Sequence, residues 1–110
     1  MSELNIEHYA ESDFKMIIYG PVKNPQILID GYSYQIHTTV EENEYLEIDS
    51  AEGTVVRTKQ DGSRIDEFDN RDFENSVFRK IPSGRLSINW SGDFGWDIIV
   101  FKERSAPEWK

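Results

Sequence analysis

The segment that most constrains the fold is the last third of the chain, where two strand-like runs flank a glycine-rich turn. Polar and apolar residues alternate over 87–91, which is the period of a strand with one face in water. The stretch 91–95, Ser-Gly-Asp-Phe-Gly, has the composition of a turn. The apolar run 98–101 predicts a strand that is covered on both faces. Together they predict a closing hairpin and an antiparallel β architecture.

Short strand-like runs separated by turn signals recur along the rest of the chain. These runs are rich in β-branched and aromatic residues and lie at 14–19, 26–29, 32–38, 45–49, 54–59 and 77–81. Asp30-Gly31 has the composition of a two-residue hairpin turn. The stretch 63–75 fits neither the strand nor the helix period, and we expect a loop with a short helical turn there. Turns at roughly 8–12 residue spacing predict an all-β fold, an antiparallel β-sandwich with a barrel as the alternative.

The length of the chain fits one domain. With 110 residues there is little room for two cores. Aromatic residues make up 13% of the chain, and their large buried areas make a small core feasible. We expect a polar N-terminal arm or linker over 1–13 and a single β-sandwich domain over 14–110.

Charge and residue types exclude several classes of function. The net charge of −9 argues against binding to nucleic acids or to anionic membrane surfaces, because a protein binds either of them through clustered Lys and Arg side chains. The chain has no cysteine, which excludes disulfides, thiolate metal sites and cysteine nucleophiles. No apolar run reaches the length of a membrane span, so we expect no membrane insertion.

The titratable residues suggest no catalytic, cofactor or metal site. His8 and His37 lack partners at metal-ligand spacing. The carboxylates of 61–74 could attract calcium, but the stretch does not match the EF-hand pattern, and a solvated loop is the expected state. The glutamates of 41–47 could suggest a glycosidase pair, but that chemistry needs two acids across a cleft. We therefore expect a protein that is not an enzyme and that has no cofactor.

The aromatic residues supply the candidates for a ligand or partner surface. Trp90 and Trp96 flank the closing turn, so at least one of them should pack in the core. An exposed tryptophan on a β-sandwich could instead stack on a sugar ring. We name Trp90, Trp96 and Tyr45 as the candidate residues for binding a ligand or a partner.

Four ordered blocks give the chain a resemblance to a known family. They are IYGPVKNPQI over 18–27 followed by Tyr34, EYLEIDS over 44–50, DG at 61–62 followed by Phe68, Arg71, Phe78 and IPSG at 81–84, and WSGDF over 90–94 with RSAPEW over 104–109. In this order and spacing they resemble the C-terminal domain of distal tail proteins of phages and prophages of Gram-positive bacteria. The resemblance covers the chain from about residue 14 to its end.

The resemblance implies a fold and a role. It implies a galectin-like or carbohydrate-binding-module-like jelly roll that decorates a ring at the end of a siphovirus tail. The protein would be a structural component of the virion tail tip, made in the host cytoplasm, that links the tail tube to baseplate or receptor-binding proteins. The parent protein would be a ring oligomer, and we expect this domain alone to be a monomer or a weak dimer. The alternative is a carbohydrate-binding module that contacts host cell-wall glycans.

Overall fold

The computed structural model describes residues 2–6, 11–82, 84–90 and 92–101. Within them the chain forms strands and one short 3-10 helix, η1 (Phe68–Asn70). The strands are β1 (Ser2–Ile6), β2 (Phe14–Tyr19), β3 (Val22–Lys23), β4 (Gln26–Ile29), β5 (Tyr32–Gln35), β6 (Thr39–Val40), β7 (Tyr45–Asp49), β8 (Thr54–Thr58), β9 (Arg64–Asp66), β10 (Gly84–Trp90) and β11 (Trp96–Val100). No helix among these residues is long and apolar enough to cross a membrane.

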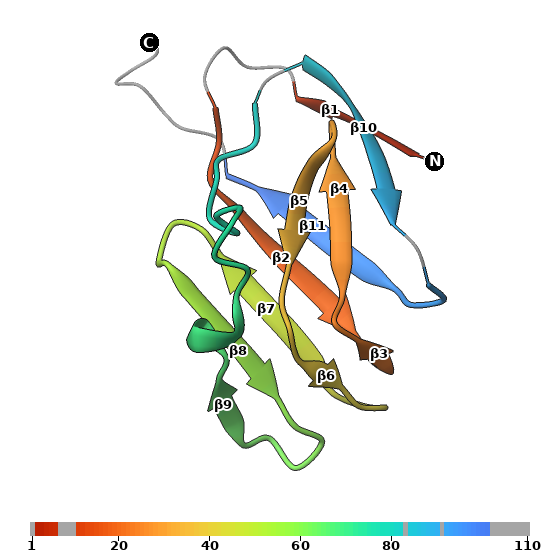
Figure 1. Ribbon diagram of the computed structural model, residues 1–110, viewed down its shortest axis with the longest axis vertical. Coiled ribbons are helices and arrows are strands. Elements are labelled where there is room, and N and C mark those ends of the chain that lie inside the picture. Colours follow the sequence, from red (N-terminus) through yellow and green to blue (C-terminus); the bar gives the residue numbers. More distant parts are fainter. Residues whose placement is uncertain (1, 7–10, 83, 91, 102–110) are drawn as a thin grey trace, which may run out of the picture.

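The strands form two main antiparallel sheets that pack face to face. The larger sheet has the strand order β11-β2-β7-β8-β9, and the smaller sheet has the order β1-β10-β4-β5. In Figure 1 the larger sheet runs diagonally and the hairpin β4–β5 lies across it. A short pair, β3–β6, lies at one end. The predicted all-β antiparallel sandwich is confirmed.

Period-2 alternation places one face of each sheet in the core between them. The burial of β2 alternates strictly from Phe14 to Ile18, and that of β7 does so around Leu46 and Ile48. The inward side chains of both sheets form one buried cluster: Phe14, Met16, Ile18, Leu46, Ile48 and Val55 from the larger sheet, and Ile27, Ile29, Tyr34, Leu86 and Ile88 from the smaller. Burial of this apolar area is the main source of stability in a chain without disulfides.

The hairpin β4–β5 has the turn that the sequence predicts. Asp30 and Gly31 connect the strands, with φ angles of 52° and 84°. Positive φ at both central residues is the requirement of a type I′ turn, whose twist matches that of the flanking strands. The register pairs Ile29 with Tyr32 and Ile27 with Tyr34, so all four side chains share one face of the sheet.

The predicted closing hairpin is wrong. β10 pairs with β1 and β4, whereas β11 pairs with β2 in the other sheet. The connection between them is an arch that crosses from one sheet to the other. The rings of Trp90 and Trp96 meet across it edge to face, 5.4 Å between centroids, and both pack against the core. Both rings are half-buried between the sheets, and their contact stabilises the arch.

Strand β11 also differs from expectation. The apolar run predicts a strand covered on both faces, but Ile99 is 48% exposed whereas Ile98 and Val100 pack against the core. β11 lies at the edge of the larger sheet, and the smaller sheet covers one of its faces. Ile99 is therefore an exposed apolar side chain on an edge strand.

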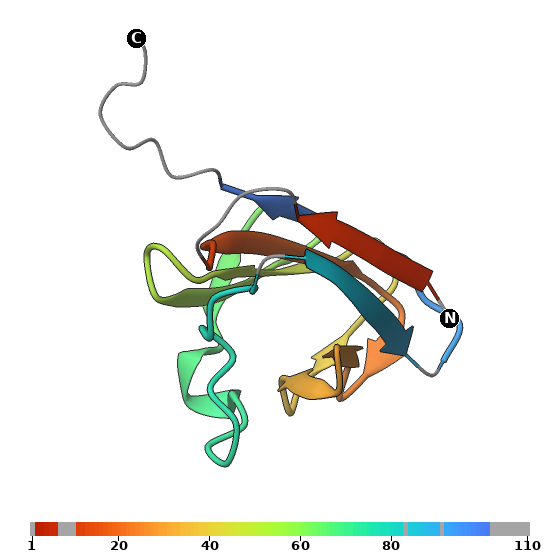
Figure 2. The ribbon, with the colours of Figure 1, turned by 90° about the horizontal axis from the view of Figure 1, so that it is seen from above.

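The segment 77–81 is not the strand that its composition predicts. Ile81 forms one isolated bridge with Ser12, and the preceding residues are turns. Hydroxyls of the hairpin β4–β5 hold this segment: Tyr32 donates to the Ser76 carbonyl and Tyr34 to the Arg79 carbonyl, each at 2.8 Å. Seen from above, this segment and the hairpin lie on the same side of the larger sheet (Figure 2). It therefore closes the open side of the core.

Three element boundaries also differ. The region 63–75 contains the predicted helical turn, η1, but also the strand β9, which pairs with β8. The predicted strand 32–38 ends at Gln35, because His37 then donates its backbone N–H to the Asn70 carbonyl. Within the predicted arm 1–13, Ser2–Ile6 forms β1 and pairs along the whole of its length with β10.

Candidate functional site

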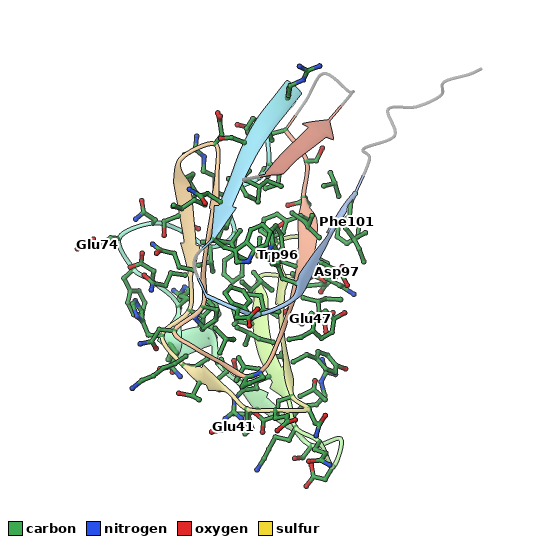
Figure 3. All side chains as sticks on the ribbon, turned by 90° about the vertical axis from the view of Figure 1, so that its right-hand side faces the viewer. Glu41, Glu47, Glu74, Trp96, Asp97 and Phe101 are labelled. Carbon is green, nitrogen blue, oxygen red and sulfur yellow. The ribbon has the colours of Figure 1, made fainter. Side chains whose placement is uncertain are left out.

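The outer face of the larger sheet carries exposed apolar and aromatic side chains among charges. These side chains alternate with the buried ones, and the register places them in adjacent rows across β11, β2 and β7. We call this surface the outer sheet face and define it by Lys15, Ile17, Tyr19, Tyr45, Glu47, Asp97 and Ile99. Figure 3 shows the alternation on β11: Trp96 points between the sheets, whereas Asp97 lies on the outer side with Glu47.

Side-chain pairs hold the outer sheet face in a defined arrangement. Tyr19 donates its hydroxyl to Asp97 at 2.9 Å, and Lys15 forms an ion pair with Glu47 at 3.0 Å. The bond to the Asp97 carboxylate raises the pKa of Tyr19, and the bond to Glu47 raises the pKa of Lys15. The Tyr19 and Tyr45 rings lie 6.5 Å apart, and these side chains are 40% and 37% exposed. The face is therefore partly apolar, and side-chain contacts restrain it.

The three candidate residues from the sequence fall in two places. Tyr45 lies on the outer sheet face, where it is available to a partner. Trp90 and Trp96 contact each other and the core between the sheets. They are half-buried there and do not share a surface with Tyr45. His8 and Trp109 lie outside the described residues.

A second surface feature surrounds Phe73, which is 73% exposed. An open depression of about 460 Å³ lies beside it. We call this feature the Phe73 depression, and it is lined by Gln35, His37, Asp69, Asn70, Arg71, Asp72, Phe73 and Glu74. In Figure 3 Glu74 lies on the opposite side of the molecule from Asp97 and Glu47. The two surface features are therefore separate.

A buried ionic network ties the larger sheet to the loops at its end. Arg57 on β8 donates to Glu67 through Nε at 2.7 Å and to Glu44 at 2.8 Å. Glu67 also accepts from Thr38 at 3.1 Å and from Asn70. Among the described residues no buried side-chain nitrogen or oxygen lacks a hydrogen-bond partner. A fully satisfied network of this kind fixes a single arrangement of the loops.

This network removes two acids from the list of candidate ligands. Glu44 belongs to the acidic turn that suggested a carboxylate pair, and Glu67 to the acidic loop that suggested calcium. Both point inward to Arg57. Around them, Asp61 accepts from Ser63 and Asp66 caps the Phe68 N–H. The part of the chain that the structure describes contains no group of three His, Asp or Glu placed to hold a metal ion.

The network makes stability depend on pH. The backbone N–H of Glu41 and the guanidinium of Arg57 hold the pKa of Glu44 below its usual value. Ionised Glu44 therefore stabilises the fold above the unfolded pKa of about 4.3, and this contribution is lost as the pH falls through the lower folded pKa. We expect Glu44→Gln to lose stability less steeply than the wild type between about pH 5 and pH 3. Urea denaturation at a series of pH values measures this, and parallel curves would contradict it.

Sequence reasoning missed both the Phe73 depression and the buried network. A faint signal for Phe73 exists, because it is a large apolar residue within a charged stretch that fits no amphipathic period. Arg57 carries no such signal, because charged residues in strands are usually solvated.

Comparison of the chain with models of protein families, with characterised proteins and with solved structures finds no match.

Proposed function

We propose that this chain is a non-enzymatic structural domain of a phage or prophage tail tip, equivalent to the C-terminal domain of a distal tail protein. Two facts support the proposal. Four sequence blocks in order resemble that family, and the antiparallel β-sandwich agrees with the architecture that the resemblance implies. The finer assignment, a galectin-like or carbohydrate-binding-module-like jelly roll, is part of the same proposal.

We assign the proposed contacts with partner proteins to the outer sheet face. It presents the exposed side chains of Ile99, Tyr19 and Tyr45. Tyrosines are enriched at protein interfaces because one ring buries much apolar area while its hydroxyl keeps a polar partner. The face has two carboxylates, Glu47 and Asp97, and one lysine, Lys15, so its small net negative charge favours a partner with complementary positive charge. This surface would contact neighbouring tail or baseplate proteins in the virion tail tip.

The net charge of the chain is compatible with protein partners. A chain of net charge −9 is repelled by nucleic acids and anionic lipids, and protein partners remain the simplest class. The domain alone would be a monomer or a weak dimer, and its parent protein would supply the ring oligomer of the tail. Sedimentation at micromolar concentration distinguishes a monomer from a stable higher oligomer of this chain.

Deletion of this domain from its parent tail tests the role. We expect particles that lack residues 14–101 to fail in tip assembly or in adsorption to host cells, because the contacts of the domain with its neighbours are lost. Electron microscopy of tails and an adsorption assay give the two readouts. Unchanged assembly together with unchanged adsorption would contradict the proposal.

A second candidate function is carbohydrate binding, and one observation favours it. A sugar site on a β-sandwich needs an exposed aromatic ring beside polar groups in a shallow depression. The Phe73 depression has these features, although it lies away from the tryptophans that the sequence suggested. Host cell-wall glycans would be the ligands in this case.

A further inference from the structure

Phe73 is the most exposed large apolar side chain among the described residues, at 73%. Residues 73–75 form a bend, in which the Glu74 N–H donates to the Asp72 carboxylate at 3.2 Å, and the fold leaves the Phe73 ring uncovered. A single exposed apolar residue is ordinary on a protein surface. What sets Phe73 apart is its place at the edge of a depression that is otherwise polar.

The Phe73 depression is held in a defined shape. Its backbone is fixed to the strand end by two hydrogen bonds, from His37 N–H to the Asn70 carbonyl at 2.7 Å and from Asp72 N–H to the Gln35 carbonyl at 3.1 Å. The Arg71 guanidinium lies 3.7 Å from the centroid of Phe68 and 4.8 Å from that of Phe73. Cation–π contacts of this kind restrain both rings. Phe73 is thus a positioned ring, and ligand binding need not first order it.

The lining of the depression suits a sugar ring. A pyranose has an apolar C–H face, which stacks on an aromatic ring, and a rim of hydroxyls, which donate and accept hydrogen bonds. Phe73 supplies the ring, and the Asp69 and Glu74 carboxylates supply acceptors. His37 and Gln35 add polar atoms to the lining. The volume of about 460 Å³ lies in the range of small-molecule sites.

The charge of the depression selects among sugars. Three carboxylates, from Asp69, Asp72 and Glu74, face one guanidinium, that of Arg71, which is already occupied by the Phe68 carbonyl at 2.7 Å and by two rings. His37 lies 4.0 Å from Asp72, so its protonated form would offset part of this negative charge. A uronic acid or a phosphorylated sugar would bring like charge to this surface and would be repelled.

We propose that the Phe73 depression is a binding subsite for one or two rings of a neutral saccharide, with Phe73 as the stacking platform. The proposal rests on the second candidate function, carbohydrate binding, and locates the binding site at the Phe73 depression. It is independent of the protein contacts that we assign to the outer sheet face, which lies on the opposite side of the molecule (Figure 3).

Titration of the full chain with soluble disaccharides tests this subsite. The probes are lactose, cellobiose and di-N-acetylchitobiose, with digalacturonic acid as the anionic counterpart, and the readout is the set of backbone amide shifts in NMR. We expect at least one neutral probe to shift the amides of 70–74 with a dissociation constant on the order of 1 mM. Digalacturonic acid should not change the chemical shifts of these amides.

Three variants locate the site. Phe73→Ala should weaken binding about tenfold, whereas Phe73→Trp should keep it, because a larger ring still offers a stacking face. Tyr45→Ala removes an exposed ring from the outer sheet face and should bind as the wild type does. Phe73 is so exposed that its replacement should leave the melting temperature unchanged, which excludes unfolding as the cause of lost binding.

The possible failures are distinguishable. If the wild type binds a neutral disaccharide and Phe73→Ala binds it equally well, the subsite is wrong and carbohydrate binding stands. If no neutral probe shifts any amide at about 10 mM, both the subsite and the carbohydrate function are overturned. Neither result bears on assembly of the tail, which is measured separately.

Discussion

Arg57→Ala is expected to lower the free energy of unfolding by about 3–5 kcal/mol at pH 7, which is the usual cost of breaking a buried ion pair from one side. The guanidinium is the shared partner of Glu44 and Glu67, both of which are buried. Its removal leaves two carboxylates close together in a region of low dielectric constant. Desolvation of the unpaired charges and their mutual repulsion both disfavour the folded state. A loss of this size is a large share of the stability of a small domain.

Urea denaturation of Arg57→Ala measures this loss, with Arg64→Ala as the matched control. Arg64 lies on the neighbouring strand β9 and is exposed, so its replacement should change stability by less than about 0.5 kcal/mol. The cost of Arg57→Ala should shrink at low pH, because protonation of Glu44 removes one of the charges that the variant leaves unpaired. Equal stability of the two alanine variants at pH 7 would show that the network contributes nothing.

Gly20→Ala should be the most damaging change at a glycine, with a loss of about 2 kcal/mol. Gly20 follows β2, where the loop 40–44 crosses closely over the backbone. A Cβ atom at this position would lie 1.9 Å from the carbonyl oxygen of Glu41 and 2.6 Å from that of Val40. Both atoms belong to the backbone, so the loop itself must shift. Alanine restricts the unfolded chain and so favours folding by about 0.4–1 kcal/mol, which is smaller than the cost of the clash.

Gly95→Ala is the matched control for this prediction. Gly95 also lies beside the end of β2, where its carbonyl accepts the Tyr19 N–H at 2.9 Å. A Cβ atom there would have its nearest neighbour, a carbon of Tyr19, at 3.9 Å, which is ordinary contact. Thermal denaturation should show Gly95→Ala at or slightly above the wild type and Gly20→Ala well below it. A Gly20→Ala protein as stable as Gly95→Ala would disprove the close approach of the loop.

Residue patterns within short segments predict much of this fold, because neighbouring residues specify its strands and turns. The strands β2, β4 and β7 follow from short runs rich in β-branched and aromatic residues between turn signals, and the turn at Asp30-Gly31 follows from two residues that tolerate positive φ. The residue pattern of a strand does not determine which other strand it pairs with. The same glycine-rich turn can close a hairpin or carry the chain from one sheet to the other, and the choice depends on where Trp90 and Trp96 are best covered. That is a property of the whole core.

The candidate site is predicted less well, for a related reason. Tyr45 is placed on the surface because Leu46 and Ile48 occupy the inner face of its strand, which is a local argument. The position of Phe73 depends on the Arg71 guanidinium and on the backbone hydrogen bonds that its segment forms with Gln35 and His37. Gln35 and His37 are far away from Phe73 in the sequence. Side chains that meet only after folding leave no spacing to recognise.

One comparison tests the central claim, that the outer sheet face joins this domain to its partners in a phage tail. Ile99→Arg adds a bulky charge to this face at an exposed position of β11, and Asn89→Arg adds the same side chain to an exposed position of β10 in the smaller sheet. Both variants should fold, because neither side chain is buried. Adsorption of assembled particles is the measurement. We predict that Ile99→Arg lowers it by at least about tenfold and that Asn89→Arg leaves it unchanged, and full adsorption by Ile99→Arg particles would contradict the claim.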